Sequence, residues 1–225
     1  MFVLSKKLEL VKQDIIGRCG CQTGCSKCSS QLRFITRLAD AGIPVAYWFL
    51  KMSDFSGAEN IKKATETYIA SIKQSYQDGS CICFAGTLGT GKTYSMTNIL
   101  KAALAKDFTA YYTSLSDIVN NLTNFETKYR YNDLVCHSDF LAIDEVDSRH
   151  IASSDAAKDF FGANFERIIR FRVQNKLPTL MATNNAGIEE AFGGQFRKTI
   201  ESLASSKMLV VPALGKDYRL SGEKV

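Results

Sequence analysis

The stretch FAGTLGTGKTYSM, residues 84–96, decides the fold. It matches the pattern G-x-x-x-x-G-K-[ST], and the apolar segment CICFA at 81–85 precedes it. A glycine-rich loop between a strand and a helix, here starting near residue 92, lets backbone N–H groups wrap the phosphates of a nucleotide. The stretch therefore predicts an ATP site, with ligand contacts from Gly86, Thr87, Leu88, Gly89, Thr90, Gly91, Lys92, Thr93 and Tyr94.

Four side chains have specific expected roles in catalysis. Lys92 reaches the β- and γ-phosphates, and the Thr93 hydroxyl is a ligand of Mg²⁺. The stretch DFLAIDEVD at 139–147 reads as a buried strand that ends in Asp144 and Glu145. We expect Asp144 to hold Mg²⁺ through water and Glu145 to polarise the attacking water. A plain strand-end acid is the alternative for Glu145.

A polar amide pair follows the next apolar segment, LPTLMATNN at 177–185. We expect Asn184 to contact the γ-phosphate and to orient the water that lies between the γ-phosphate and Glu145. Asn185 could share this role, and an ordinary turn at a strand end is the alternative.

Strand and helix patterns alternate from residue 81 onward. The predicted strands are 81–85, 109–113, 139–143, 179–183 and 207–212. The predicted helices start near 92 and cover about 115–122, 156–175 and 195–204. An earlier helix is expected over 61–79, closed by Gly79. This alternation predicts an α/β fold with a parallel sheet covered by helices on both faces.

Cysteines cluster near the N-terminus in the pattern C-x-C-x₃-C-x₂-C, after a short amphipathic helix with apolar residues at 4, 8, 11 and 15. Four thiolates suit a tetrahedral Zn²⁺ with no open position, which is a structural site. An iron–sulfur cluster and free or redox-active thiols are the alternatives. Since no secretion signal is visible, a reducing compartment favours metal over disulfides. The expected ligands are Cys19, Cys21, Cys25 and Cys28.

Composition allows one sizeable domain plus a small appendage in 225 residues. Residues 1–40 carry +4 of the net charge of +5. This basic segment suits a partner surface or nucleic-acid phosphates, and a solvated helix explains it equally well. We expect a zinc-binding module at 1–40, an ATPase domain at 41–225, no membrane span and a cytoplasmic location.

Taken together, these residues resemble the AAA+ ATPases of the DnaC/DnaI helicase-loader and IstB group, over about 42–219. AGIPVAYWFLKMSDFSG at 41–57 is similar to the lead-in segment of that family. The segment 166–184 resembles its long helix, arginine and Pro-Thr before the sensor strand. KDYR at 216–219 resembles its closing Tyr-Arg, which makes Arg219 the expected sensor-2 arginine. Since six residues follow Arg219, we expect a minimal or absent helical lid.

The resemblance also implies two contacts with macromolecules. In that family an arginine of a neighbouring subunit completes the ATP site. Counting back from DYR at 217–219 without gaps places this arginine position at Ser202. Arg197 and Lys198 lie just over one helical turn earlier, and either could take the role of the arginine. The family carries a helical insertion that binds single-stranded DNA, and the matching region here is about 114–138. Cations interleaved with aromatic residues suit such binding, and an amphipathic surface is the alternative. The expected DNA contacts are Lys128, Tyr129 and Arg130.

The implied function is ATP-dependent loading of a replicative hexameric DNA helicase onto single-stranded DNA. The N-terminal module would dock on the helicase, and the chain would self-assemble through AAA+ interfaces. Hydrolysis would be slow and would depend on assembly. An IstB-type transposition ATPase and a non-hydrolysing adaptor switched by ATP are the alternatives. The cysteine cluster counts against the first, and Lys92, Asp144 and Glu145 count against the second.

Overall fold

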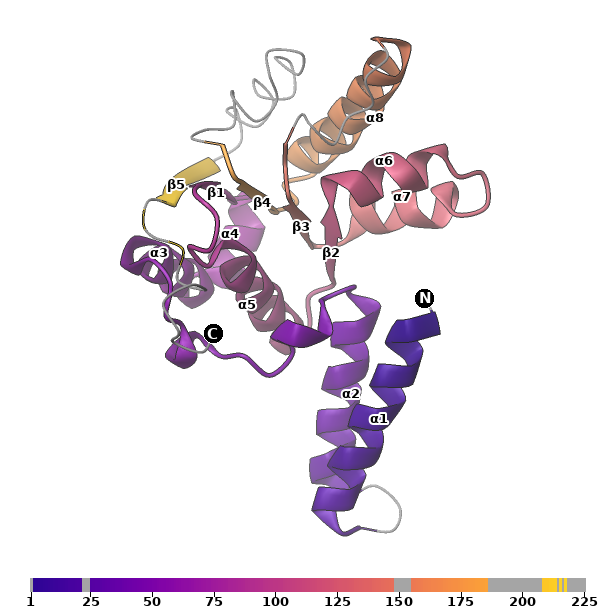
Figure 1. Cartoon of the computed structure of the whole chain (residues 1–225), viewed down its shortest axis with the longest axis vertical. Helices are drawn as coiled ribbons and strands as arrows, with labels where there is room; N and C mark the ends of the chain where they lie inside the picture. Colours follow the sequence, from indigo (N-terminus) through magenta and orange to yellow (C-terminus); the bar gives the residue numbers. More distant parts are fainter. Residues whose placement is uncertain are drawn as a thin grey trace.

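Five parallel strands form the centre of the described chain (Figure 1). The structure is a computed structural model that describes residues 2–21, 25–147, 155–185, 208–213, 215 and 217. The strand order is β2-β3-β4-β1-β5. The strands are β1 (Cys81–Gly86), β2 (Ala110–Ser114), β3 (Phe140–Asp144), β4 (Thr179–Thr183) and β5 (Met208–Ala213). The prediction of an α/β fold with a parallel sheet is confirmed.

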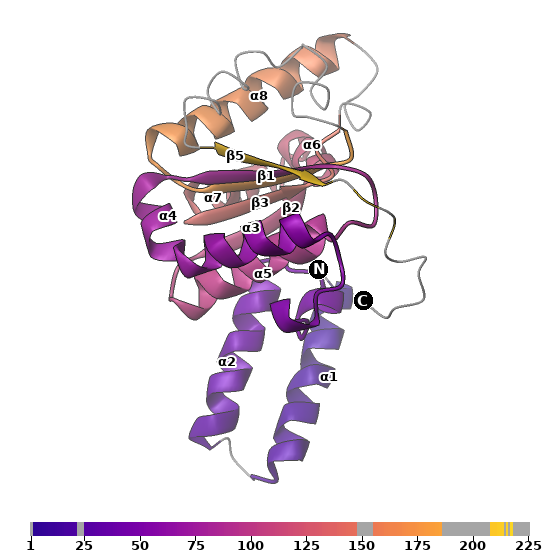
Figure 2. The same ribbon diagram turned by 90° about the vertical axis from the view of Figure 1, so that its left-hand side faces the viewer.

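Helices cover both faces of this sheet (Figure 2). Helices α3 (Glu59–Ala70), α4 (Ile72–Asp78) and α5 (Lys92–Ala105) lie on one face. Helices α6 (Leu115–Thr123), α7 (Lys128–His137) and α8 (Asp155–Gln174) lie on the other. A hydrophobic core lies on each face of the sheet, and alternate residues of β1 point into one or the other. Ile82 and Phe84 pack in the core with α5, and Cys83 packs in the core with α8. A strand that is buried on both faces is therefore a run of mainly apolar residues, as β1 is.

The expected helix over 61–79 is wrong in one respect, because Ser71 divides it into α3 and α4. Ser71 has φ −101° and ψ 20°, which is outside the helical range, and its hydroxyl donates to the Thr67 carbonyl at 3.1 Å. A serine side chain that competes for backbone carbonyls interrupts a helix in this way. Gly79 ends α4 in a left-handed conformation, φ 68°, as expected. The expected helix at 195–204 lies outside the described residues.

Arg172 of α8 is fully buried and ties three segments together. Its guanidinium donates to the Thr179 hydroxyl at 3.0 Å and to four backbone carbonyls, those of Val135, Cys136, Ser138 and Pro178. Burial lowers the pKa of Arg172 to about 10. The arginine thus joins α8 to the end of α7 and to the start of β4, and it explains why an arginine precedes the Pro-Thr pair.

The N-terminal segment forms a helical hairpin of α1 (Phe2–Cys19) and α2 (Ser26–Asp40), which projects from the sheet domain (Figures 1 and 2). The base of α2 is anchored: Ile35 and Leu38 are buried in the core that contains α5, and Arg37 bonds to the Asp107 carboxylate at 2.9 Å. Two short 3₁₀ turns, η1 (Val45–Tyr47) and η2 (Met52–Asp54), connect the hairpin to α3. In the described part of the chain, no helix is long and apolar enough to span a membrane.

Candidate functional site

The loop after β1 adopts a conformation that requires its glycines. Gly86 has φ 142° and Gly91 has φ 97°, both in the region that side chains disfavour. A Cβ on Gly86 would lie 2.3 Å from the Ala213 carbonyl oxygen, and one on Gly91 would lie 2.5 Å from the Phe55 ring. The loop can therefore pack between β5 and the lead-in segment only with glycine at these positions.

A cavity of about 180 Å³ lies at the tip of this loop and collects most of the predicted site residues. Lys92 is 7 % exposed, and its ammonium donates to the carbonyls of Gly86 at 2.9 Å and Thr87 at 2.6 Å. The loop, β3 and the end of β4 all contribute walls. The predicted residues on these walls are Leu88, Gly89, Thr90, Gly91, Lys92, Thr93, Tyr94, Asp144, Glu145 and Asn184.

The Asp144 carboxylate is held by three donors. Its Oδ2 atom accepts from the Thr93 hydroxyl at 2.7 Å and from the Tyr112 hydroxyl at 2.7 Å, and its Oδ1 atom accepts from the Glu145 N–H at 2.8 Å. Burial, and then the charge of Asp144, raise the pKa of Tyr112, so its hydroxyl stays protonated and donates. Thr93 and Asp144, the two expected Mg²⁺ ligands, are thus in direct contact, which fits an oxygen-coordinated cation.

Tyr112 is a site residue that sequence reasoning missed. It lies on β2, next to β3, at the position that pairs with Ala142. The alternation along 109–113 places Tyr112 and Tyr111 on opposite faces of the sheet, but only the strand order brings Tyr112 to Asp144. No local motif signals this contact.

Tyr112→Phe is expected to raise the Mg²⁺ concentration for half-maximal ATP turnover by about three- to tenfold. The Asp144 carboxylate keeps two of its three donors, so only a part of the roughly 1.5–3 kcal/mol of a hydrogen bond to a charged acceptor is lost as its orientation loosens. Titration of turnover with Mg²⁺ measures the shift. Tyr111→Phe, on the opposite face of β2, is the matched control, and an equal effect of both variants would refute the role of Tyr112.

Glu145 has a left-handed backbone, φ 53°, at the point where the chain leaves β3. Non-glycine residues in this region are strained, and such strain concentrates at functional sites. The next N–H, that of Val146, donates to the Ala182 carbonyl at 2.9 Å, so the chain turns across β4 while the Glu145 side chain stays exposed at the cavity. Asn184 follows β4 and lines the same cavity. The two side chains therefore line the same cavity.

The lead-in segment closes the cavity from the side of α3. The Ala58 N–H donates to the Thr90 carbonyl at 3.1 Å, and the Phe55 ring packs on Gly91. Tyr94, an expected ligand contact, is 3 % exposed; its hydroxyl donates to the Lys51 carbonyl at 2.6 Å, and its ring meets the Phe55 ring edge-on. The geometry makes Tyr94 part of the cavity wall that anchors the lead-in segment.

The residues after β5 include one unexpected neighbour of the loop. A Cβ on Gly89 would lie 1.7 Å from Oδ1 of Asp217, so this carboxylate lies directly against the phosphate-binding loop. A negatively charged carboxylate at this point repels the negatively charged phosphates of a nucleotide. The expected sensor-2 arginine, Arg219, and the candidates for the arginine finger, Ser202, Arg197 and Lys198, lie outside the described residues.

The four cysteines converge at the tip of the hairpin. Cys19 ends α1, Cys25 caps α2, and Cys28 lies in its first turn. The Sγ atoms are 3.3 Å apart for Cys19 and Cys25, 3.2 Å for Cys21 and Cys28 and 3.6 Å for Cys25 and Cys28, and all four lie within 4.8 Å of one another. Tetrahedral zinc, with Zn–S bonds of about 2.3 Å, needs Sγ atoms about 3.8 Å apart. The donor set therefore fits a zinc ion with a small expansion.

Metal analysis of the purified chain is expected to find about one zinc per chain, since four thiolates close one tetrahedral site. Cys28→Ser is expected to lose most of this zinc, because Cys28 is a buried member of the cluster. Cys136→Ala, which changes a cysteine in α7 away from the cluster, is the control. A folded, metal-free wild-type chain would refute the zinc site.

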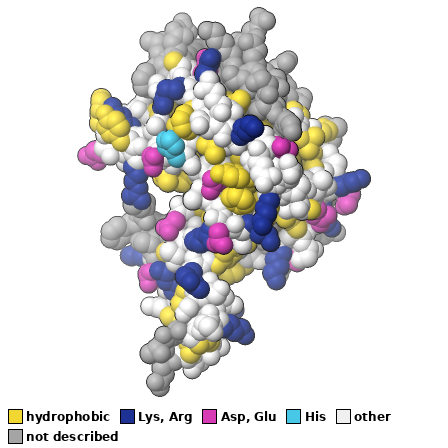
Figure 3. Space-filling model, turned by 180° about the vertical axis from the view of Figure 1, so that it is seen from behind, with side chains coloured by type: hydrophobic (Ala, Val, Ile, Leu, Met, Phe, Trp, Pro, Cys, Tyr) yellow, Lys and Arg dark blue, Asp and Glu magenta, His cyan; other side chains and the backbone are white. Residues whose placement is uncertain are grey.

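The predicted DNA contacts lie at the start of α7. Phe125 and Tyr129 are 82 % and 77 % exposed, and the Lys128 ammonium lies 4.8 and 4.9 Å from their ring centroids. Arg130, one position further, is also exposed. On the face seen in Figure 3, Lys and Arg side chains are interspersed with acidic ones and form no continuous basic patch. Any contact with phosphates on that face is therefore local.

Comparison with known proteins gives a likeness of structure. No family model matches the sequence, and no curated protein matches it. The structure titled "Crystal structure of the DnaC helicase loader" matches with a TM-score of 0.60 and 18 % identity, over 75 % of this chain and 99 % of that one. This chain therefore has the same overall fold as that structure.

Two further structures share this fold. "Crystal Structure of the DnaI" matches with a TM-score of 0.58 and 16 % identity, over 77 % of this chain and 93 % of that one. "Replication initiator DnaA bound to AMPPCP and single-stranded DNA" matches with a TM-score of 0.60 and 15 % identity, over 75 % of this chain. The chain spans about half the length of that DnaA structure, 50 %. These two structures therefore share the fold of this chain, at low sequence identity.

Proposed function

We propose that the chain loads a replicative hexameric DNA helicase onto single-stranded DNA in an ATP-dependent reaction. The observation that carries the proposal is the convergence of Lys92, Thr93, Asp144, Glu145 and Asn184 on one cavity. This cavity lies in a domain that has the same fold as a structure described as the DnaC helicase loader.

Each residue of the cavity has a defined task in the proposed ATPase reaction. ATP with Mg²⁺ supplies the phosphoryl group that is transferred to water. Lys92 holds the β- and γ-phosphates, while Thr93 and Asp144 hold the metal. Glu145 accepts a proton from the attacking water, and Asn184 orients that water. The loop Gly86–Gly91 supplies backbone N–H groups to the phosphates.

The remaining parts of the chain would serve its partners. Residues 1–40, with a zinc ion held by the four cysteines, dock on the helicase, and 41–225 form the ATPase domain. The chain assembles through AAA+ interfaces at which a neighbour's arginine, with Arg197 as a candidate, completes the site, and Arg219 contacts the nucleotide. The expected location is the cytoplasm.

A loading assay tests this proposal. The chain is mixed with the host's replicative helicase and circular single-stranded DNA, and helicase bound to the closed circle is measured with and without ATP. We expect loading to require both the chain and ATP, and Lys92→Ala to abolish it. If the chain retrieves a transposase and no helicase from its host, the IstB-type alternative replaces the loader. Loading with ATP that is never hydrolysed would favour the adaptor.

Tyr129→Ala combined with Lys128→Ala is expected to weaken binding to single-stranded DNA by about 10- to 100-fold. Each base stacked on an aromatic ring contributes about 1–3 kcal/mol, and Lys128 adds a phosphate contact. Fluorescence anisotropy with a labelled oligonucleotide measures the change. Lys73→Ala on α4, an exposed lysine with no aromatic ring contact in the described chain, is the control. Equal binding by the double variant and the wild type would assign these residues to an ordinary surface.

A further inference from the structure

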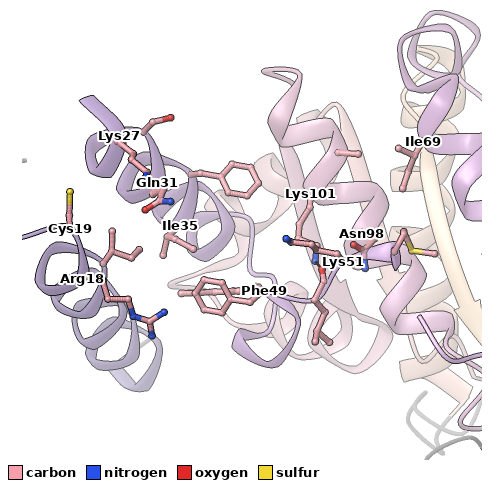
Figure 4. A pocket seen from close by; sticks show the side chains of 17 residues that line it. Arg18, Cys19, Lys27, Gln31, Ile35, Phe49, Lys51, Ile69, Asn98 and Lys101 are labelled. Atoms are coloured by element: carbon pink, nitrogen blue, oxygen red, sulfur yellow. Dashed lines mark hydrogen bonds between the residues drawn. The ribbon is translucent and has the colours of Figure 1, made fainter. Parts of the chain in front are cut away.

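A second and larger cavity, of about 1030 Å³, separates the helical hairpin from the sheet domain (Figure 4). We name it the hairpin groove. One wall comes from α1 and α2 and includes Arg18 and Ile35. The opposite wall comes from the lead-in segment and α5 and includes Phe49, Lys51, Asn98 and Lys101. The proposals above assign Cys19 to zinc and residues 1–40 to helicase docking, but they name no ligand for the groove itself.

The surface of the hairpin groove combines apolar area with positive charge. Ile35 and Trp48 line it and are 5 % and 3 % exposed, while Phe49 is 61 % exposed. Phe49 does not stand alone, because Ile15 and Phe34 also line the groove and are partly exposed, and a contiguous apolar surface marks a site of interaction. The apolar side chains of the groove can therefore receive apolar side chains of a ligand.

The charge of the hairpin groove has one sign. Its lining includes four Lys or Arg side chains and, in the described chain, no Asp or Glu. The charge of Arg18 is paired with the Asp14 carboxylate at 2.6 Å. The positive charge of Lys27 would be offset by the negative charge of the cysteine thiolates at the hairpin tip. Lys51 and Lys101 stand on the opposite wall, away from the thiolates, and supply the charge that a ligand would meet (Figure 4).

Lys101 is the most confined of these cations. It is 9 % exposed, and its ammonium donates to the Leu50 carbonyl and, at 2.8 Å, to the Tyr47 carbonyl. Its described partners are neutral carbonyls, and burial lowers its pKa to about 8. A carboxylate that enters the groove would offset this loss of hydration, because it supplies the opposite charge in a place of low dielectric.

We infer that the hairpin groove binds an acidic, amphipathic segment of a partner protein. The apolar face of the segment packs on Phe49, Phe34 and Ile15, and its carboxylates lie toward Lys51 and Lys101. An amphipathic helix in an apolar groove is a recurring form of peptide recognition. Nucleic acid fits less well, because the buried part of the lining is aliphatic and aromatic. The inference goes beyond the loader proposal and rests on the groove alone.

A peptide selection on the full chain with its metal tests the inference. The probe is a library of random 15-residue peptides displayed on phage, and the affinity of enriched, resynthesised peptides is measured by fluorescence anisotropy. We expect an excess of Asp and Glu in these peptides, with apolar residues at a spacing of three and four. Phe49→Ser and Lys51→Glu, both at exposed side chains, are expected to weaken binding at least tenfold. Lys73→Glu on α4 is the control and is expected to bind as the wild type does.

Three outcomes would overturn the inference. The first is enriched peptides without acidic residues, and the second is equal binding by the two groove variants and the wild type. The third is a 15-nucleotide single strand that binds the wild type more tightly than the peptides do and loses this affinity in Lys51→Glu. The last outcome would assign the groove to nucleic acid. The assay contains neither a helicase nor a loading step, so failure of the loader proposal does not change its result.

Discussion

Glu145→Gln is expected to leave ATP binding intact and to reduce ATP turnover by about 10²–10⁴-fold, the range for loss of a general base. The Glu145 carboxylate lines the cavity beside Asp144 and Lys92, where it can accept a proton from water. Glutamine keeps the size of the side chain and the left-handed backbone strain, but it cannot take up a proton. The variant therefore separates proton transfer from nucleotide binding.

Two measurements on Glu145→Gln are needed. Equilibrium binding of a fluorescent ATP analogue should match the wild type, while phosphate release in the presence of helicase and DNA should fall to the background rate. Glu66→Gln, an exposed carboxylate of α3 away from the cavity, controls for the loss of one negative charge. Unchanged turnover would remove the catalytic role of Glu145 and leave it as a strand-end acid.

The sequence predicts those parts of the structure that depend on near neighbours. The glycine-rich loop is recognisable because its spacing, the strand before it and the helix after it all lie within residues 81–105. The strands are predicted within about one residue, because β1, β3 and β4 are buried runs between turns and the edge strands β2 and β5 are rich in aromatic or β-branched residues. Asp144 and Asn184 could be placed at one edge of the sheet, since the carboxyl ends of parallel strands meet there.

Contacts between distant segments could not be predicted in this way. Tyr112 reaches Asp144 only because β2 lies beside β3, and strand order is not written in a local pattern. The same limit applies to Asp217, whose contact with Gly89 depends on the path of the chain after β5. The hairpin groove required the position of α1 and α2 relative to α5. The four cysteines indicated a metal site, and apolar spacing predicted the helix before it, but no pattern predicted α2 after it.

Arg172→Met is expected to destabilise the chain by about 3–5 kcal/mol, the range for breaking a buried charged network. The methionine keeps the apolar stem of the side chain but leaves one hydroxyl and three carbonyls without their buried donor, while the Pro178 carbonyl still accepts from the Leu141 N–H at 3.2 Å. Such orphaned groups cost about 1–3 kcal/mol each when they stay buried, and relaxation of the two segments recovers part of that cost. Urea unfolding, followed by the fluorescence of the single tryptophan, Trp48, measures the change.

Two companion variants identify the cause of this loss. Arg172→Lys keeps the charge but has no planar fork, so it can satisfy fewer of the five acceptors, and an intermediate loss is expected. Arg170→Met removes an arginine two residues away that is exposed and pairs with Glu166, and less than about 1 kcal/mol is expected from it. Equal losses at 170 and 172 would refute the network.

Because Arg172 joins the start of β4 to the turn before β3, its loss should also loosen the strands that carry Asp144 and Asn184. ATP turnover in Arg172→Lys should therefore fall at temperatures where the chain is still folded, and in Arg170→Met it should not.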